Sequence, residues 1–187
     1  MKKTIMRIVM GTTLITASAA QAVTISLDQA STTSVAGSNF SLDVLADFSS
    51  TEIIQGSVEF NFDSNLLSYT GFSWNSDFLS LLALAELEIE SSDTVSIGFG
   101  VGITDDPLTG PGHTIGTISF DALATGSTSV NMAVSSFHGG YLDPDLNIVT
   151  ASFNNASVDI SAVPVPAAVW LFGSGLIGLA GIARRRA

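Results

Sequence analysis

Cysteine is absent from this chain of 187 residues. Disulfide bonds, a thiol nucleophile and a thiolate metal site are therefore all excluded. The protein must hold together through an apolar core, for which its hydrophobic content of 46% is sufficient. The length allows one domain of ordinary size together with processing segments at the ends.

Basic residues are almost as scarce, and all six of them are terminal: Lys2, Lys3, Arg7, Arg184, Arg185 and Arg186. All 17 acidic residues lie between Val23 and Val163, so this segment has a formal charge of −17. A segment without cations cannot neutralise phosphates, which excludes nucleic acid as a partner and disfavours docking to anionic lipid. It also lacks the Lys and Arg side chains that would offset repulsion among its carboxylates.

The first 22 residues have the three parts of a secretory signal peptide. MKKTIMR is a short basic region, and IVMGTTLITASA is an apolar stretch of the usual length. Ala20 and Ala22 place small residues at the −3 and −1 positions of a cleavage site. We therefore expect signal peptidase to remove residues 1–22 and the exported chain to begin at Val23.

The middle of the chain alternates between apolar and polar residues with period two. In NFSLDVLADF, for example, Leu42, Val44 and Phe48 share one parity, with Ser41 and Asp43 opposite. The alternation recurs in GSVEFNF, DTVSIGFGV, HTIGTISFDA, TSVNMAV and NASVDI, and turn sequences such as FDSN and ATGS separate these runs. Residues 23–161 are therefore predicted to form an all-β domain, an antiparallel two-sheet sandwich of about eight or nine strands.

The segment DFLSLLALAELEIE is ambiguous. Its start could form a helical turn, whereas LALAELEIE alternates and places Glu86, Glu88 and Glu90 on one side. We predict a strand with an acidic face for this segment.

The succession of these strands resembles that of cohesin domains. ISLDQASTTSVAGSNFSLDVLADF resembles their opening, and GSVEFNFDSNLLSYTGF resembles the next block, with Phe62 and Asp63 at its turn. GHTIGTISFDAL and SSFHGGYLDPDLNIVTASFNNASVDI resemble the later strands, so the likeness spans most of residues 23–160. It implies a cohesin-like jelly roll that serves as a non-catalytic interaction module. Cohesins bind dockerins through a sheet face, but no short motif transfers those contact positions to this sequence.

Catalysis has little support in the sequence. His113 in GPGHT and His138 in FHGG belong to neither a HExxH pattern nor a serine-nucleophile elbow, and we interpret both as surface loop residues. The domain has no lysine or arginine to stabilise a developing anion. Two carboxylates could hydrolyse glycosides, yet no pair among the 17 acids is distinguished by its pattern. We predict a protein that is not an enzyme and needs no cofactor.

Calcium is the one metal for which the sequence offers a candidate site. DPDLN places Asp143, Asp145 and Asn147 at alternate positions, the spacing that opens an EF-hand loop. Ile148 and Asn154, however, stand where that loop requires Gly and Glu. An Asx turn with exposed carboxylates is the alternative interpretation of the same residues.

Aromatic residues leave carbohydrate binding open. Trp74 and Tyr69 could stack on sugar rings, but the core of a sandwich also needs large side chains. We expect both side chains to be at least partly buried.

Residues 162–187 form a separate segment. Residues 165–183 are apolar and, at about 1.5 Å per residue, long enough to cross a bilayer as a single helix. Arg184, Arg185 and Arg186 would then lie on the cytoplasmic side, with the domain outside.

The same segment resembles the PEP-CTERM sorting signal of Gram-negative bacteria. The residues that carry the resemblance are Pro164, Pro166, Trp170, Gly173, Gly175, Arg184, Arg185 and Arg186. Val165 stands where the signal has its name-giving Glu. The resemblance implies transient anchoring in the inner membrane through residues 165–183, cleavage by an exosortase near the Pro-x-Pro pair, and transfer to the cell surface or extracellular matrix.

The sequence thus predicts an exported binding or scaffolding module of the envelope, biofilm or exopolysaccharide. Its expected partners are signal peptidase, an exosortase, and exopolysaccharide or another surface protein. Two alternatives remain open. One is a permanently membrane-anchored acidic structural protein, and the other is a hydrolase that acts on polysaccharide.

Overall fold

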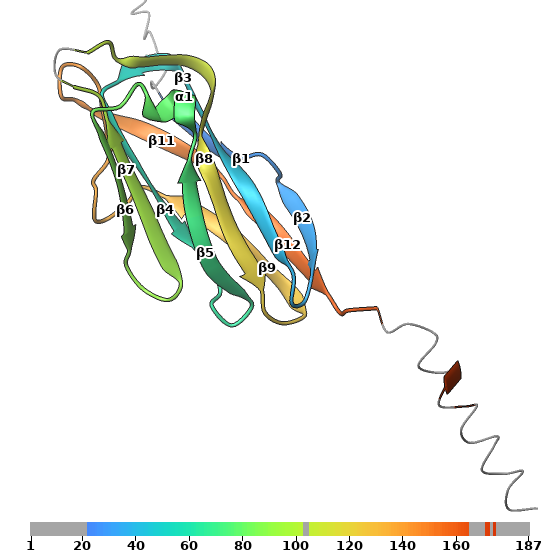
Figure 1. Cartoon of the computed structure of the whole chain (residues 1–187). Coiled ribbons are helices and arrows are strands. Elements are labelled where there is room, and N and C mark those ends of the chain that lie inside the picture. The colour runs from blue at the N-terminus through green and yellow to red at the C-terminus, as the bar shows by residue number, and fades with distance from the viewer. Residues whose placement is uncertain (1–21, 103–104, 165–170, 173, 175–187) are drawn as a thin grey trace, which may run out of the picture.

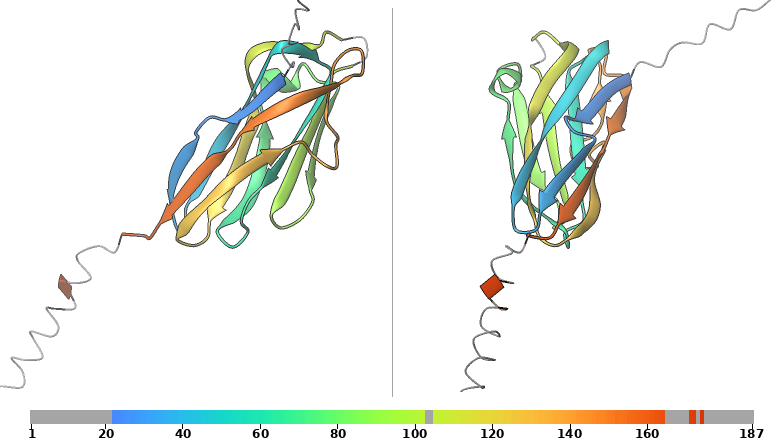
Figure 2. Two further views of the ribbon diagram at one scale, coloured as in Figure 1. Left: turned by 180° about the vertical axis from the view of Figure 1, so that it is seen from behind. Right: turned by 90° about the vertical axis from the view of Figure 1, so that its right-hand side faces the viewer.

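The computed structural model describes residues 22–102, 105–164, 171, 172 and 174. Twelve strands in this part of the chain form two layers packed face to face (Figures 1 and 2). Among the described residues, no helix is both long and apolar enough to span a membrane. Most of the predicted span 165–183 and all of Arg184, Arg185 and Arg186 lie outside the described residues.

The first layer has the strand order β11-β1-β3-β8-β5. Its members are β1 (Ala22–Leu27), β3 (Asn39–Ile53), β5 (Leu67–Trp74), β8 (Leu108–Ala122) and β11 (Ile148–Asn154). The long strands β3 and β8 pair over most of their length and form the centre of this layer.

The second layer has the order β2-β12-β9-β4-β7-β6. Its members are β2 (Ser31–Val35), β4 (Gln55–Asn61), β6 (Leu84–Ile89), β7 (Thr94–Gly100), β9 (Gly126–Ala133) and β12 (Ala156–Ser161). The two-residue strand β10 (Tyr141–Leu142) connects the layers, because it pairs with both β4 and β11.

The predicted sandwich is confirmed, but the strand count and the pairing differ from the prediction. Twelve strands form instead of eight or nine, because the run at each end of the domain breaks into two strands. These are β1 and β2 at the start and β11 and β12 at the end, and the two strands of each run lie in different layers. The last run changes at Asn155, whose side-chain oxygen accepts from the Met132 amide and whose side-chain nitrogen donates to Asn131. Two pairs, β1 with β11 and β2 with β12, are parallel rather than antiparallel.

Alternation places the core as predicted. Leu42, Val44 and Phe48 of β3 are buried, and so are the alternating apolar residues of β7, Val95, Ile97 and Phe99. Trp74 and Tyr69 are partly buried against the core, in agreement with the prediction.

The segment between β5 and β7 contains both a helical turn and a strand. The predicted strand forms over Leu84–Ile89, while the preceding residues form α1 (Ser76–Leu79). Asn75 caps this short helix, because its side-chain oxygen accepts from the amides of Asp77 (2.9 Å) and Phe78 (3.1 Å). Phe78 is buried and closes one end of the core.

Salt is expected to stabilise the domain. In the described residues the carboxylates have no Lys or Arg partner, and the one ion pair joins Glu86 to a histidine. Raising the salt concentration from about 0.01 M to about 1 M shortens the Debye length from about 30 Å to about 3 Å and so weakens their repulsion. We expect the melting temperature to rise by several degrees in sodium chloride. A constant or falling melting temperature would contradict this prediction.

High pH is expected to destabilise the domain through Tyr141. This side chain is fully buried, its hydroxyl has no hydrogen-bond partner, and burial raises its pKa well above the ordinary 10.0. The unfolded chain loses this proton near pH 10.0 and the folded chain does not, so stability falls as pH rises above that value and is unaffected below it.

Tyr141→Phe should reduce this alkaline loss and leave stability at neutral pH unchanged or higher, because no hydrogen bond is broken. Urea unfolding at about pH 7 and about pH 11 measures both effects. An alkaline loss equal to that of the wild type would rule out Tyr141 as its source. The part that remains is expected from Tyr69, whose pKa burial also raises.

Candidate binding site

A loop crosses the outer face of the second layer. It comprises residues 134–140, between β9 and β10, and we call it the crossing segment. The Ser135 amide donates to the Ser57 hydroxyl (3.1 Å), and that hydroxyl donates to the Gly139 carbonyl. The Ser135 hydroxyl in turn accepts from the amides of Phe137 (3.1 Å) and His138 (3.0 Å). These bonds fix the backbone of the crossing segment against β4.

Glu59 of β4 holds the start of the same segment. One of its carboxylate oxygens accepts from both the amide and the hydroxyl of Ser136, each at 3.2 Å. The other oxygen accepts from the side chain of Asn61 at 3.0 Å. These hydrogen bonds, that of Asn61 above all, lower the pKa of Glu59 below its ordinary value. The carboxylate therefore stays charged and keeps its partners down to low pH.

His138 is buried rather than exposed, which corrects the prediction that it is a surface residue. Its side chain is only 7% exposed because it lies directly over Gly98 of β7. A Cβ atom at residue 98 would come within 2.7 Å of the imidazole Cγ, so only glycine admits the ring. The imidazole Nδ1 lies 3.4 Å from a carboxylate oxygen of Glu86 on β6, and its Nε2 is buried without a partner.

A hollow of about 290 Å³ lies between the crossing segment and β6. Its lining includes Gln55, Leu84, Glu86, Phe137 and His138. Phe137 packs its ring edge-on against His138, with the centroids 4.9 Å apart, yet is 63% exposed. Leu84 on the other side is 51% exposed. The hollow therefore combines two exposed apolar side chains with one carboxylate on a fixed backbone.

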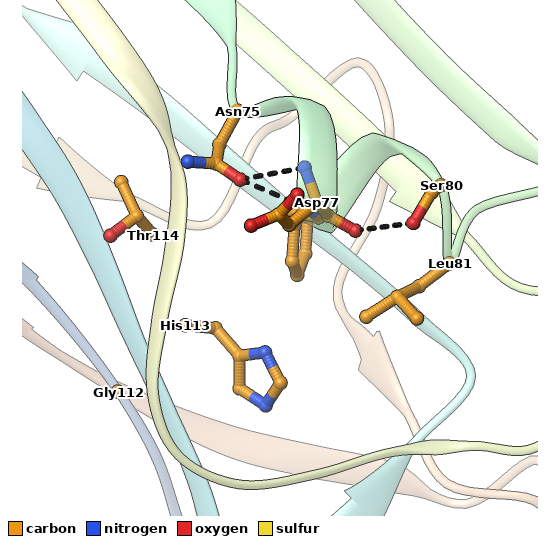
Figure 3. A pocket seen from close by; sticks show the side chains of 8 residues that line it. Asn75, Asp77, Ser80, Leu81, Gly112, His113 and Thr114 are labelled. Atoms are coloured by element: carbon orange, nitrogen blue, oxygen red, sulfur yellow. Dashed lines mark hydrogen bonds between the residues drawn. The ribbon is translucent and has the colours of Figure 1, made fainter.

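A larger pocket of about 500 Å³ lies beside α1 at the end of the sandwich (Figure 3). Asp77, Ser80 and Leu81 lie on one side of it, and His113 lies opposite (Figure 3). The Nε2–H of His113 donates to the Thr109 carbonyl at 2.8 Å, since a carbonyl oxygen can only accept. An adjoining pocket of about 470 Å³ contains Asp105 and Asp106 and shares Ser80, Leu81 and His113 with the first.

Two arrangements typical of catalytic sites are not found among the described residues of these pockets. In the described part of the chain, no hydroxyl donates to a histidine ring, so the hydrogen bond that would activate a serine nucleophile is not formed there. Nor do the described residues contain a group of three His, Asp or Glu side chains that could hold a metal ion.

The loop predicted as a calcium site forms an Asx turn. One oxygen of Asp143 accepts from the amides of Asp145 (3.0 Å) and Asn147 (2.8 Å), and the other accepts from the Asn147 side chain (3.0 Å). The hydrogen bonds from Asn147 lower the pKa of Asp143. The interpretation of this loop as an Asx turn is therefore confirmed. Calcium binding by Asp143, Asp145 and Asn147 stays a prediction.

The sorting and cleavage residues lie at the margin of the described chain. Pro164 is described, whereas Ala20, Val165, Pro166, Trp170, Gly173, Gly175, Arg184, Arg185 and Arg186 are outside it. Ala22 is the first residue of β1 and pairs with Thr150 of β11. Cleavage after Ala22 would remove one residue of β1 and leave the other five.

Sequence reasoning missed the hollow. Phe137 and Leu84 belong to separate segments, and no periodicity connects them. One signal was present: Gly98 interrupts the outward side of β7, and a glycine inside a strand often marks a close approach of another group.

Comparison with known proteins supports the fold. The seventh ScaB type I cohesin of Pseudobacteroides cellulosolvens has a TM-score of 0.61 and 14% identity, over 78% of this chain and 96% of that one. The Coh-OlpC–Doc435 complex, a type I cohesin–dockerin complex of Clostridium thermocellum, has a TM-score of 0.64 and 12% identity, over 78% of this chain and 97% of that one.

A third similar structure is a non-cellulosomal cohesin from the archaeon Archaeoglobus fulgidus, with a TM-score of 0.55 and 15% identity, over 79% of this chain and 95% of that one. No protein-family model matches the sequence. No curated protein matches it either. The chain therefore has a cohesin-like sandwich fold.

Proposed function

We propose that this protein is an exported, non-catalytic module that captures another surface protein through the hollow beside β6. The observation that carries the proposal is the pair of exposed apolar side chains, Phe137 and Leu84, on either side of that hollow. Most outward-facing strand residues elsewhere in the domain are Ser, Thr or Asp. An apolar pair in such surroundings favours a protein contact.

The site needs little rearrangement to bind. The crossing segment is bonded to β4 through Ser57 and Glu59, so Phe137 is held in place before a partner arrives. Preorganised side chains lose less conformational entropy on binding than mobile ones. A large aromatic side chain near the centre of an interface is also a typical binding hot spot.

The similar structures support a binding role. Among them is a type I cohesin–dockerin complex of Clostridium thermocellum, in which the cohesin binds a partner protein. The partner proposed here is a surface protein with exposed cationic and apolar residues, because Glu86 lines the hollow and the domain is anionic throughout.

Cross-linking at residue 137 tests the binding role. A photoreactive phenylalanine analogue at Phe137, introduced in the producing cells, should give a discrete adduct with one envelope or matrix protein. The same analogue at Ile148, an exposed residue of β11, is the matched control and should give none. Loss of the adduct on Leu84→Ser would support the hollow as the site. If no adduct forms at residue 137, or if both positions give the same one, the proposal fails.

We further propose that the C-terminal segment sorts the protein. Residues 162–187 would anchor it in the inner membrane until an exosortase cuts near Pro164 and Pro166. The resemblance of the Pro-x-Pro pair, the apolar run and the arginine cluster to PEP-CTERM signals supports this route. The domain would then reach the cell surface or an exopolysaccharide matrix.

Intact mass and cell fractionation test the sorting. A mature chain that begins at Val23, ends near Val163 and lies outside the inner membrane is the expected result. Full-length C-termini in the inner membrane would instead support the permanently anchored alternative. Replacing Arg184, Arg185 and Arg186 by alanine should block processing and leave the precursor in the membrane.

A further inference from the structure

The strand β6 forms an open edge of the second layer. In the described chain three strands pair on one side only, namely β2, β5 and β6. Of these, β6 alone carries exposed large apolar side chains: Leu84, Leu87 and Ile89. Figure 1 shows β6 at the margin of the sandwich with β7 on one side of it. An open apolar edge is a template for pairing with another chain.

The free backbone groups of β6 can be assigned from its ladder. The amide of Glu90 donates to the Thr94 carbonyl at 3.0 Å, so residue 90 turns its backbone toward β7. Alternate residues of an antiparallel ladder do the same, which assigns Glu86 and Glu88 to the paired side. Ala85, Leu87 and Ile89 therefore present their N–H and C=O groups to the open edge.

The side chains of β6 divide between the two faces. Leu87 and Ile89 lie beside Ile97 and Val95 of β7, on the core side of the layer, but are 41% and 59% exposed. Glu86 and Glu88 lie on the opposite side, beside Gly98 and Ser96. A strand added to this edge would thus cover apolar side chains with one face and meet carboxylates with the other.

Charge decides which strand fits. A second copy of this domain would place its own glutamates against Glu86 and Glu88, and like charges opposite each other destabilise a strand pair. Between Val23 and Val163 the chain has no lysine or arginine to supply the opposite charge. We infer that β6 is a strand-addition site for an extended segment of a partner protein, in which apolar residues alternate with basic ones.

This inference rests on the proposed function and specifies how the partner is held. Leu84 and Glu86 belong both to β6 and to the hollow below the crossing segment. A strand paired with β6 would therefore extend the contact surface that Phe137 and Leu84 form at the hollow. Main-chain hydrogen bonds would supply affinity, and the alternating side chains would supply selectivity.

A model peptide tests the inference. The probe is an acetylated peptide of alternating lysine and valine, titrated into the exported protein and followed by amide NMR shifts. We expect saturable binding, with the largest shifts at the amides of Ala85, Leu87 and Ile89. The same peptide N-methylated on alternate amides should bind at least about tenfold more weakly, because it cannot complete the ladder.

Variants of β6 separate pairing from charge. Leu87→Pro removes an amide that faces the open edge, which a folded edge strand tolerates, and should weaken binding about tenfold or more. Glu88→Gln should weaken binding severalfold and reduce its dependence on salt. The N-methylated peptide provides the same test without a mutation if the proline variant does not fold.

Three outcomes would overturn the inference: no saturable binding of the peptide, equal affinity for its N-methylated form, or shifts confined to strands other than β6. The cross-link at residue 137 does not depend on strand pairing. Its success together with failure of the peptide would refute strand addition alone, whereas its failure would refute the proposed function.

Discussion

Replacing Phe120 by alanine is expected to lower the free energy of unfolding by about 4 kcal/mol, the middle of the usual range for a buried phenylalanine. Phe120 of β8 is fully buried and lies among other aromatic rings. Its centroid is 5.0 Å from that of Phe62, which directly follows β4 of the second layer, and 5.7 Å from that of Phe40 on β3 of the first layer. Neighbours fixed in two layers cannot collapse into the space that the ring leaves.

Urea unfolding of the variant measures this loss directly. Phe137→Ala is the matched control, because it removes the same atoms from an exposed ring and should change stability by no more than about 0.5 kcal/mol. Similar losses for both variants would contradict the assignment of Phe120 to the centre of the core. A loss below about 2 kcal/mol would do the same.

The core could be predicted because the side chains of a half-buried strand point alternately to the core and to solvent. Leu42, Val44 and Phe48 share a parity, and a single register then buries all three. The prediction needs only residues that are close together in the sequence. For the same reason the two layers could be inferred without any knowledge of which strands pair.

The strand breaks could not be predicted in this way. Asn155 lies inside an alternating run, and its effect depends on Met132 and Asn131 of another strand, which hold its side chain. Pairing partners so distant in the sequence leave no local pattern. The parallel pairs of β1 with β11 and β2 with β12 follow from these breaks and were missed with them.

His138 shows why the candidate binding site cannot be predicted from the sequence. A histidine next to two glycines is typical of an exposed loop, and the FHGG sequence therefore predicts one. Its burial depends on Gly98, which lies in a different strand and leaves room for the ring. Neither residue alone indicates the contact. The ring of His138, on the crossing segment, occupies the space that a side chain at residue 98 of β7 would fill.

The crossing segment also explains a buried polar residue. Ser57 belongs to the outward row of β4, yet it is fully buried. Ser57 is bonded to Ser135 and Gly139 of the crossing segment. The second layer is therefore covered on both faces in this region, and the proposed binding surface consists of the crossing segment and β6 rather than the bare strands β4 and β7.

A second large effect is expected at Gly56 of β4, whose replacement by alanine should lower the free energy of unfolding by about 3 kcal/mol. An added Cβ would lie 2.5 Å from Cε1 of Tyr141 and 2.6 Å from Cζ of Phe99. Both rings are buried and pack against each other, with centroids 6.2 Å apart, so neither can move aside without disturbing the other. Overpacking of this kind strains the core instead of filling space.

Gly71→Ala is the control, since a Cβ at that position of β5 meets nothing within 4 Å. Alanine there should leave stability unchanged or raise it by up to about 1 kcal/mol, because it restricts the unfolded chain. Equal stability of the two glycine variants would contradict the close approach at Gly56. The double variant Gly56→Ala with Tyr141→Ala gives a sharper test, because removing the ring also removes the overlap. Its loss should be smaller than the sum of the two single losses, and strict additivity would show that Gly56 and Tyr141 are not in contact.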